Sequence, residues 1–479
     1  MKDILEYFTK PEIRSSQKDI LKLVQTVWED HDVISIHAPT ATGKTAIAET
    51  IQRWALANGK AKKVNILAPE NVLIDQYEEE CPDLAVLRKS GAYKCHTQKS
   101  KMCGAITRNA RCRNCVYTTA KNNAVKADTR IMNYHVYSSN KIKADVLIFD
   151  EAHKLPGVIY SFFDLKLWHH EYKFPKTMKT LEDVVVWLQK ALSVRPGNSK
   201  LNEVYKYITS IQNGAVPVYE QALYRGEFLD VLTIRRLSIA GEGHKMWPIG
   251  TKKIILMSAT LADSDLKELG LDKKRCYTIK VDSEIPAANR QIIVEPRFSL
   301  AYSTLDAALP LLLESINELL DKHSEKGLIH LPYGIAEKVR PNLNNARLLW
   351  HNKGNKKEVL SRFKASDEVE GKVLIASGLY MGVDLPYDMA RWQLIGKIPF
   401  PSLGDPFIKR KMEQDGSWYA WQTIKLILQA AGRIVRAPTD YGVTYIFDSN
   451  FGRLYRDNPK LFPPFFKNSV RLQPRNTRL

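Results

Sequence analysis

A short run of small and hydroxylated residues, APTATGKT at 38–45, carries the most specific chemistry in the sequence. It follows the apolar stretch VISIHAP (33–39) and precedes an amphipathic segment, AIAETIQRWAL. A strand, a tight loop and a helix in this order are typical of a phosphate-binding loop, whose backbone amides cradle phosphate groups. In such a loop Lys44 reaches the β and γ phosphates of ATP, and Thr45 ligates Mg²⁺. The predicted ATP-binding residues are Thr40, Ala41, Thr42, Gly43, Lys44 and Thr45.

Two adjacent acids, Asp150 and Glu151, end the apolar stretch DVLIFDE (145–151) and begin an Asp-Glu-Ala-His motif. An acid at the tip of a strand beside a phosphate loop is suited to hold Mg²⁺ through its water shell, which we assign to Asp150. Glu151 is then placed to orient and deprotonate the attacking water. A solvated loop with two acids is the alternative, but it leaves the strand context and the pairing with Lys44 to coincidence.

A basic motif, QAAGRIVR (429–436), follows the helical segment WYAWQTIKLILQ. Arg433 and Arg436 are three residues apart, so on a helix they share one face. We expect both to point at the γ-phosphate of ATP, where either would act as an arginine finger. A pair of basic residues is by itself more often a solvated surface. The candidate catalytic residues are therefore Lys44, Asp150, Glu151, Gln429, Arg433 and Arg436.

Short apolar runs alternate with helical stretches along the chain, which predicts parallel βα units and an α/β fold. Residues with chemical function are expected at the carboxyl ends of the strands. The sequence has 479 residues, too many for one hydrophobic core, so we expect two α/β domains with insertions. The predicted strands are 33–39, 64–69, 145–151 and 253–260 in the first domain, and 327–332, 372–377, 391–400 and 442–448 in the second.

The alternation of apolar runs with helical stretches stops between Ala152 and about Gly250, where the sequence becomes helical and rich in aromatic residues. We expect an inserted, mainly helical subdomain. Its aromatic side chains are more readily explained as core than as platforms for base stacking, because helices routinely bury aromatic faces.

Charge points to a polyanionic partner. The formal net charge is +19, from 71 Lys and Arg against 52 Asp and Glu. Between Leu84 and Ala127 there is no acid, and many Lys and Arg side chains can displace counterions from a phosphate backbone. The basic residues of that segment are Arg88, Lys89, Lys94, Lys99, Lys101, Arg108, Arg111, Arg113, Lys121 and Lys126.

Four of the six cysteines cluster in the same basic segment, with the spacing Cys95-x7-Cys103-x8-Cys112-x2-Cys115. The other two are isolated. Taken without context, four thiolates at short spacing are most often a tetrahedral zinc site, although iron-sulfur clusters accept the same ligands.

The order of these motifs resembles that of superfamily 2 helicases, and further segments resemble the XPD and DinG-like group. Motif Ia is matched by ILAPENVLIDQ (66–76), motif III by SATL (258–261) and motif V by SGLYMGVDLP (377–386). The resemblance also covers IGKIPFPSLGDP (395–406), so it spans nearly the whole chain. It implies two RecA-like domains, an adenine contact by Gln17, and a nucleotide cleft lined by Gly382 and Asp384. Ser258 and Thr260 would couple nucleotide state to the strand-holding surface.

The resemblance further implies an ATP-dependent DNA helicase that moves 5′ to 3′ on single-stranded DNA and acts at duplex junctions. It favours a 4Fe-4S cluster over Zn²⁺ at the four cysteines. In the family a glycine commonly stands at Ala41, but we expect the alanine to adopt right-handed dihedral angles without strain. The implied domains are RecA-like domain 1 (1–88, 121–153 and 250–285), the Fe-S module (89–120), an arch-like helical insertion (154–249) and RecA-like domain 2 (286–479).

Two other functions remain open. One is an ATP-driven translocase that remodels protein-nucleic acid complexes without unwinding, and the other is a non-catalytic, metal-stabilised nucleic-acid-binding protein. A nuclease is disfavoured, since no further constellation of carboxylates stands outside the ATPase motifs. The resemblance implies a monomer. We also expect an intracellular protein, in the cytoplasm or nucleoid, because no apolar leader or membrane-spanning stretch is present.

Overall fold

The computed structural model describes residues 2–95, 102–103, 115–211, 214–224, 227–248, 250–271, 276–352, 354–378 and 385–473. The chain forms two compact units. The first contains Met1–Ala38, Gly43–Lys280 and Ser402–Asp415, and the second contains Pro39–Thr42, Val281–Pro401 and Gly416–Leu479.

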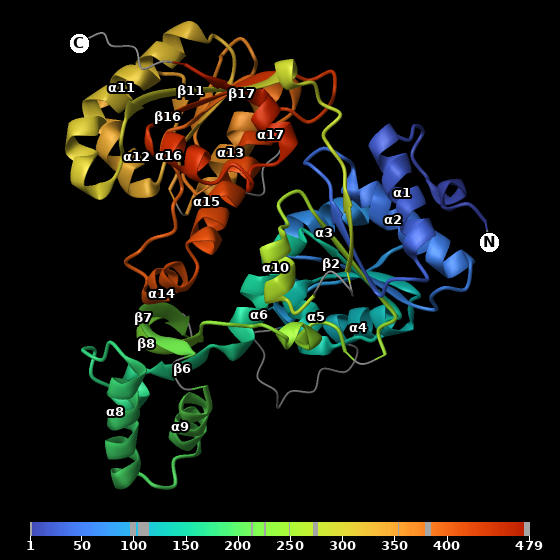
Figure 1. Ribbon diagram of the computed structural model, residues 1–479, viewed down its shortest axis with the longest axis vertical. Coiled ribbons are helices and arrows are strands. Elements are labelled where there is room, and N and C mark those ends of the chain that lie inside the picture. Colours follow the sequence, from blue (N-terminus) through green and yellow to red (C-terminus); the bar gives the residue numbers. More distant parts are fainter. Residues whose placement is uncertain are drawn as a thin grey trace. The chain divides into compact units, whose positions relative to one another are not determined.

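A seven-stranded sheet forms the core of the first unit (Figure 1). Its strands are β1 (Val33–His37), β2 (Val64–Ala68), β3 (Ala85–Leu87), β4 (Thr129–Asn133), β5 (Val146–Asp150), β9 (Lys253–Ser258) and β10 (Cys276–Lys280). The order is β10-β1-β9-β5-β2-β4-β3, and all pairs are parallel. Strands β2, β5 and β9 are buried along their whole length, as expected for a parallel sheet covered on both faces.

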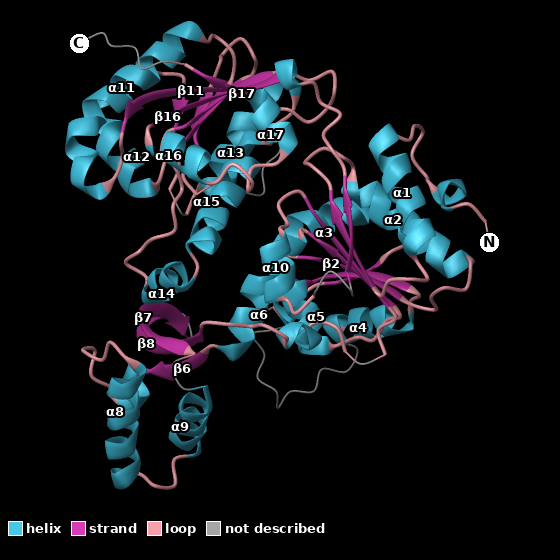
Figure 2. Ribbon diagram, viewed as in Figure 1, coloured by secondary structure: helices cyan, strands magenta, loops and turns pink. Residues whose placement is uncertain are grey.

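Helices surround this sheet, and the connections from strand to helix carry most of the predicted motif residues (Figure 2). The α-helices are α1 (Ser15–Val27), α2 (Lys44–Ala57), α3 (Asn71–Glu80), α4 (Val116–Lys126), α5 (Tyr134–Asn140), α6 (Leu155–Phe163) and α10 (Asp263–Glu268). Short 3-10 helices are η1 (Ile4–Tyr7), η2 (Ser90–Ala92), η4 (Ala152–Lys154) and η5 (Glu242–Lys245).

The insertion in the first unit contains the expected helices and also a three-stranded antiparallel sheet of order β6-β8-β7. Its elements are β6 (Leu165–Trp168), α7 (His169–Tyr172), α8 (Leu181–Val194), α9 (Ser199–Ile211), β7 (Ala215–Tyr224) and β8 (Glu227–Arg236), and α14 (Pro406–Gln414) packs against β7. The insertion has its own hydrophobic core. Five of its aromatic residues pack against that core, as predicted: Tyr172, Trp187, Tyr205, Tyr207 and Tyr219.

The second unit is built on another seven-stranded parallel sheet. Its strands are β11 (Arg290–Phe298), β12 (Gly327–His330), β13 (Leu348–Leu349), β14 (Val373–Ile375), β15 (Trp392–Ile395), β16 (Gly442–Asp448) and β17 (Val470–Leu472). The order is β13-β14-β12-β15-β16-β11-β17. Both large sheets therefore confirm the predicted α/β class with two parallel-sheet domains.

Helices of the second unit connect these strands. The α-helices are α11 (Leu305–Lys322), α12 (Tyr333–Val339), α13 (Lys356–Ala365), α15 (Gly416–Ala431), α16 (Asn450–Asp457) and α17 (Pro464–Ser469). The 3-10 helices are η6 (Ala287–Asn289), η7 (Tyr302–Thr304), η8 (Arg340–Asn342) and η9 (Tyr387–Met389). In the described ranges of the two units, no helix combines the length and the apolar character needed to cross a bilayer.

Candidate nucleotide-binding and hydrolysis site

The predicted phosphate loop joins the carboxyl end of β1 to the first turn of α2, which begins at Lys44. Gly43 caps the helix with a φ of 78°, a left-handed conformation that glycine adopts at little cost. A Cβ at this position would lie 2.4 Å from Nε2 of Gln17. The buried Gln17 side chain therefore lies directly over the loop backbone, where the family resemblance places an adenine contact.

Ala41 departs from expectation. Its φ is 68°, so the prediction of right-handed dihedral angles at this alanine is wrong. The loop turns sharply between β1 and α2, and the turn places Ala41 in the left-handed region. An alanine in that region brings its Cβ close to the following carbonyl oxygen and costs roughly 1–2 kcal/mol.

Replacing Ala41 by glycine is expected to stabilise the protein. Relief of the strain exceeds the roughly 0.5–1 kcal/mol that glycine loses in conformational entropy, so the first thermal transition should rise by about 1–4 °C. Ala48→Gly is the matched control, since Ala48 is buried within helix α2 and glycine there should lower the transition. An Ala41→Gly variant that melts at or below the wild-type temperature would show that the left-handed conformation carries no strain.

Asp150 and Glu151 lie at the carboxyl end of β5, as predicted. Asp150 is buried, and each of its carboxylate oxygens accepts one hydrogen bond: Oδ1 from the Glu151 amide at 2.9 Å and Oδ2 from the Tyr77 hydroxyl at 3.1 Å. Glu151 has a φ of 50° and lies beside the phosphate-loop lysine, with 3.6 Å between Lys44 Nζ and Glu151 Oε1. Lys44 and both acids thus lie close together at the carboxyl end of the parallel strands.

The two acids differ in pKa. Burial, reinforced by the negative charge of Glu151, raises the pKa of Asp150 to about 6. Burial would also raise the pKa of Glu151, but Lys44 and a hydrogen bond from His153 outweigh it, and the net pKa lies well below the usual range. Glu151 is therefore ionised at neutral pH, as a general base must be.

His153 links the acidic motif to the Ser-Ala-Thr segment that follows β9. Its Nδ1 lies 3.2 Å from Glu151 Oε2 and 2.9 Å from the Ser258 hydroxyl. The Ser258 hydroxyl also accepts a 3.0 Å hydrogen bond from the Thr260 amide. A chain of polar contacts therefore joins the 258–260 segment through His153 to Glu151.

Helix α3 contributes two contacts that sequence analysis missed. Gln76 Nε2 donates to the hydroxyl of Thr45 at 3.4 Å, and the fully buried Tyr77 donates to Asp150. On the other side, the Tyr134 hydroxyl donates to the main-chain oxygen of Asp150. A tyrosine on a helix facing a sheet gives no signal beyond that of an ordinary core residue, so the sequence contained little to find these positions.

The basic motif lies in the second unit, but its arginines are not helical. Helix α15 ends at Ala431, so Arg433 and Arg436 lie in the segment that follows, and the prediction that they share a helix face is wrong. The helix stops at Gly432, where a Cβ would lie 2.6 Å from Thr40 Oγ1, another residue of this unit. The Arg436 amide instead donates to Asp440 at 3.0 Å, and Gln429 lies in the last turn of α15.

Three predicted residues, Gly382, Asp384 and Cys112, lie outside the described residues. Of the other proposed metal ligands, Cys95 is buried and the Cys103 and Cys115 sulfurs are 3.9 Å apart. That distance is close to the edge, about 3.8 Å, of a tetrahedron of sulfurs with 2.3 Å bonds to one zinc ion. The pair thus fits a thiolate-ligated metal, although within the part of the chain described, no three His, Cys, Asp or Glu side chains form a metal-binding group.

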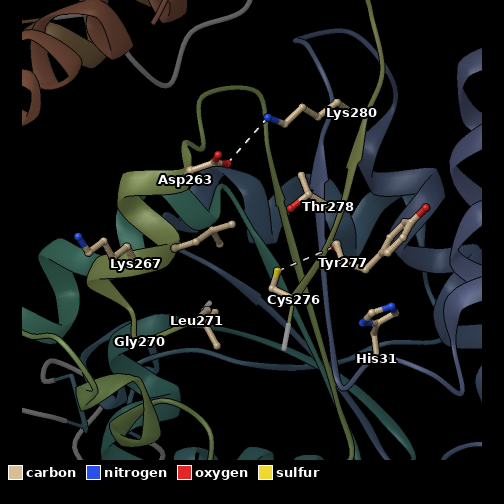
Figure 3. A pocket seen from close by; sticks show the side chains of 10 residues that line it. His31, Asp263, Lys267, Gly270, Leu271, Cys276, Tyr277, Thr278 and Lys280 are labelled. Atoms are coloured by element: carbon tan, nitrogen blue, oxygen red, sulfur yellow. Dashed lines mark hydrogen bonds and ion pairs between the residues drawn. The ribbon is translucent and has the colours of Figure 1, made fainter. Parts of the chain in front are cut away.

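A separate cavity of about 730 Å³ lies at the β10 edge of the first sheet, between β10 and α10. Figure 3 shows Asp263 and Lys280 facing each other, 3.8 Å apart, with Cys276 and Tyr277 on the strand beside them. None of the predicted site residues lines this cavity.

Comparison with known proteins finds helicases among the proteins similar to this chain. Residues 317–465 match the family profile described as "Helicase C-terminal domain", and residues 10–174 match "Type III restriction enzyme, res subunit". A probable ATP-dependent helicase of Methanocaldococcus jannaschii is 26% identical over 43% of this chain and 37% of its own length. The ATP-dependent DNA helicase YoaA of Haemophilus influenzae is 21% identical over 76% of this chain and 70% of its own length.

The fold has a close counterpart among solved structures. The structure of Xpd4 from S. tokodaii superposes with a TM-score of 0.62 at 16% identity, covering 96% of this chain and all of the other. At such low identity, the superposition shows only that the two folds are similar. The two family profiles, the similarity to YoaA and the order of the motifs support a superfamily 2 helicase of the XPD and DinG-like group, and the fold is similar to that of Xpd4.

Proposed function

We propose that the protein is an ATP-dependent DNA helicase that translocates on single-stranded DNA, 5′ to 3′, and unwinds duplexes at junctions. The observation that carries this proposal is that Lys44, Asp150 and Glu151 lie together at the carboxyl end of the parallel strands. Polar contacts of His153 connect Glu151 to Ser258. A motor that does work on nucleic acid needs such a hydrolysis site joined to a movable segment.

Lys44 would bind the β and γ phosphates, and backbone amides of 40–43 would cradle them. Thr45 and Asp150 would hold Mg²⁺, which neutralises charge on the phosphates when bound. Ionised Glu151 would orient the attacking water and accept its proton. Gln17, which lies over the loop at Gly43, would contact the adenine.

In the second unit, Arg433 and Arg436 would stabilise the charge that develops on the γ-phosphate, and Gln429, Gly382 and Asp384 would line the same nucleotide cleft. The tie between the Arg436 amide and buried Asp440 supports a fixed position for this arginine.

A nucleic-acid substrate is supported by the net charge of +19 and by the acid-free segment from Leu84 to Ala127. The choice of DNA over RNA rests on resemblance to the XPD and DinG-like group. The direction of movement and the preference for junctions rest on resemblance to the XPD and DinG-like group. A strand-displacement assay on 5′-tailed duplexes, run beside displacement of streptavidin from biotinylated single strands, tests the proposal. Streptavidin displacement without unwinding would instead establish a remodelling translocase.

Cys95, Cys103, Cys112 and Cys115 would hold a 4Fe-4S cluster, with Zn²⁺ as the alternative, and the metal would staple a basic segment that has little apolar core of its own. We propose that this module splits the duplex where the strand enters the motor. Cys103→Ser, prepared anaerobically, is expected to lose most of the bound metal and most unwinding while keeping ATP hydrolysis. Unwinding retained without metal would contradict the wedge role.

Cys276→Ala is the control for metal content, because Cys276 lies at the far edge of the first sheet and should leave metal unchanged. Quantifying iron, sulfide and zinc on the same sample distinguishes the two ligand types. About four irons per chain is the stoichiometry of a 4Fe-4S cluster. Zinc in place of iron would indicate a single tetrahedral zinc ion bound by the four cysteines.

A further inference from the structure

Helix α3 touches both of the side chains proposed to hold Mg²⁺. Gln76 donates to the Thr45 hydroxyl at 3.4 Å, and its neighbour Tyr77 donates to the Asp150 carboxylate at 3.1 Å. Thr45 comes from the first turn of α2 and Asp150 from the end of β5. One helix therefore connects two ligands that are more than a hundred positions apart in the sequence.

We propose that Tyr77, assisted by Gln76, is a positioning residue that orients Asp150 and Thr45, the side chains proposed to hold Mg²⁺ through its water shell and directly, respectively, and so tunes the affinity of the enzyme for the metal. The proposal rests on the function proposed above and deepens it. Tyr77 lies just outside every motif named in the sequence, and Gln76 is the last residue of one of them.

The Tyr77 hydroxyl matters because of how Asp150 is held. The Glu151 amide binds Oδ1 and Tyr77 binds Oδ2, so the two hydrogen bonds fix the rotation of the carboxylate about its side-chain axis. The Tyr134 hydroxyl fixes the main chain of the same residue. Without the hydrogen bond from Tyr77, Oδ2 of Asp150 loses this donor. The carboxylate can then rotate about its side-chain axis, because only the hydrogen bond to Oδ1 remains to orient it.

Helix α3 is itself anchored, so it can serve as a fixed support. Its N-cap residue Glu70 pairs with Lys154 at 2.5 Å, four positions after Asp150. Its outer face is clamped by Arg88, which pairs with Asp75 at 2.6 Å and with Glu78 at 2.5 Å. Tyr77 is held between these two anchors.

Magnesium is the ion most sensitive to such positioning, because it demands near-ideal octahedral geometry. Outer-shell hydrogen-bond partners of metal ligands typically contribute 10- to 100-fold in metal affinity or activity. Tyr77→Phe removes only the hydroxyl. The half-saturating Mg²⁺ concentration for DNA-stimulated ATP hydrolysis should therefore rise by about 10- to 100-fold, with the maximal rate approached again at high Mg²⁺.

The matched control is Tyr137→Phe. Tyr137 is another buried tyrosine of the first unit, and its hydroxyl has no hydrogen-bond partner among the described residues. Its replacement removes the same atom without touching a carboxylate. Gln76→Ala is a second variant at an exposed position, and it should raise half-saturating Mg²⁺ by about 2- to 10-fold, the effect of one hydrogen bond.

The outcomes separate the two proposals. If Tyr77→Phe and Tyr137→Phe require the same Mg²⁺, or if Tyr77→Phe lowers the maximal rate equally at every Mg²⁺ concentration, the positioning role is overturned. If Tyr77→Phe does not fold, an unchanged Mg²⁺ requirement in Gln76→Ala overturns it. Asp150→Asn tests the underlying function: hydrolysis at the wild-type rate in that variant would overturn the proposed hydrolysis site itself.

Discussion

Replacing Glu151 by glutamine is expected to slow ATP hydrolysis by about 10²- to 10⁴-fold, the contribution of a general base, while ATP still binds. The amide keeps the shape of the side chain but cannot accept the proton of the attacking water. Lys44 loses its partner at 3.6 Å and remains free to bind phosphate, so affinity for ATP should be equal or higher. Single-turnover hydrolysis and binding of a fluorescent ATP analogue measure the two properties separately.

Glu29→Gln is a suitable control for this substitution, because Glu29 is an exposed acid of the same unit that pairs only with Lys60 among the described residues. It should hydrolyse ATP at the wild-type rate. A Glu151→Gln variant that binds ATP and turns it over normally would assign the role of base to another residue.

Replacing Arg436 by alanine is expected to lower the hydrolysis rate by about 10³- to 10⁵-fold, the range measured for arginine fingers. The guanidinium would meet charge that develops only in the transition state, so KM for ATP should change much less than kcat. The backbone tie to Asp440 does not depend on the side chain, so the segment should keep its fold.

Arg453→Ala serves as the control, since the Arg453 side chain is 83% exposed on helix α16 of the same unit. Arg433→Ala tested in parallel decides which arginine is the finger, because only that variant should show the full loss of kcat. Equal and small losses in both would mean that neither arginine meets the γ-phosphate.

Much of the fold was predictable because parallel sheets leave a strong signal. Strands covered on both faces read as continuous apolar runs, and all eight predicted runs are strands, from β1 to β16. The strands that were missed include short ones at the sheet edges, such as β3, β13 and β17, which have two or three residues. At that length an edge strand is indistinguishable from a loop.

The hairpin of β7 and β8 was missed for another reason. Its strands pair in register from Ala215 with Arg236 to Tyr224 with Glu227, but polar and apolar residues do not alternate regularly along either strand. Charged and aromatic residues at this density also fit an amphipathic helix. The periodicity of apolar residues therefore did not distinguish strands from helices in this segment.

The chemistry of the site was easier to predict than its geometry. Residue types and spacing indicated the lysine and the two acids, because phosphate and Mg²⁺ restrict which side chains can serve. The left-handed Ala41 and the end of helix α15 before Arg433 depend on local backbone conformation, which neighbouring residues impose. Tyr77 depends on how α3 packs across the sheet, a tertiary contact with no local signature.

The most direct test of the central claim is ATP hydrolysis by the anaerobically purified protein with and without single-stranded DNA, together with unwinding of a 5′-tailed duplex. We predict hydrolysis that depends on DNA, unwinding that depends on hydrolysis, and loss of both in Glu151→Gln. Hydrolysis that is absent or indifferent to DNA in the wild-type protein would contradict the assignment of a nucleic-acid motor.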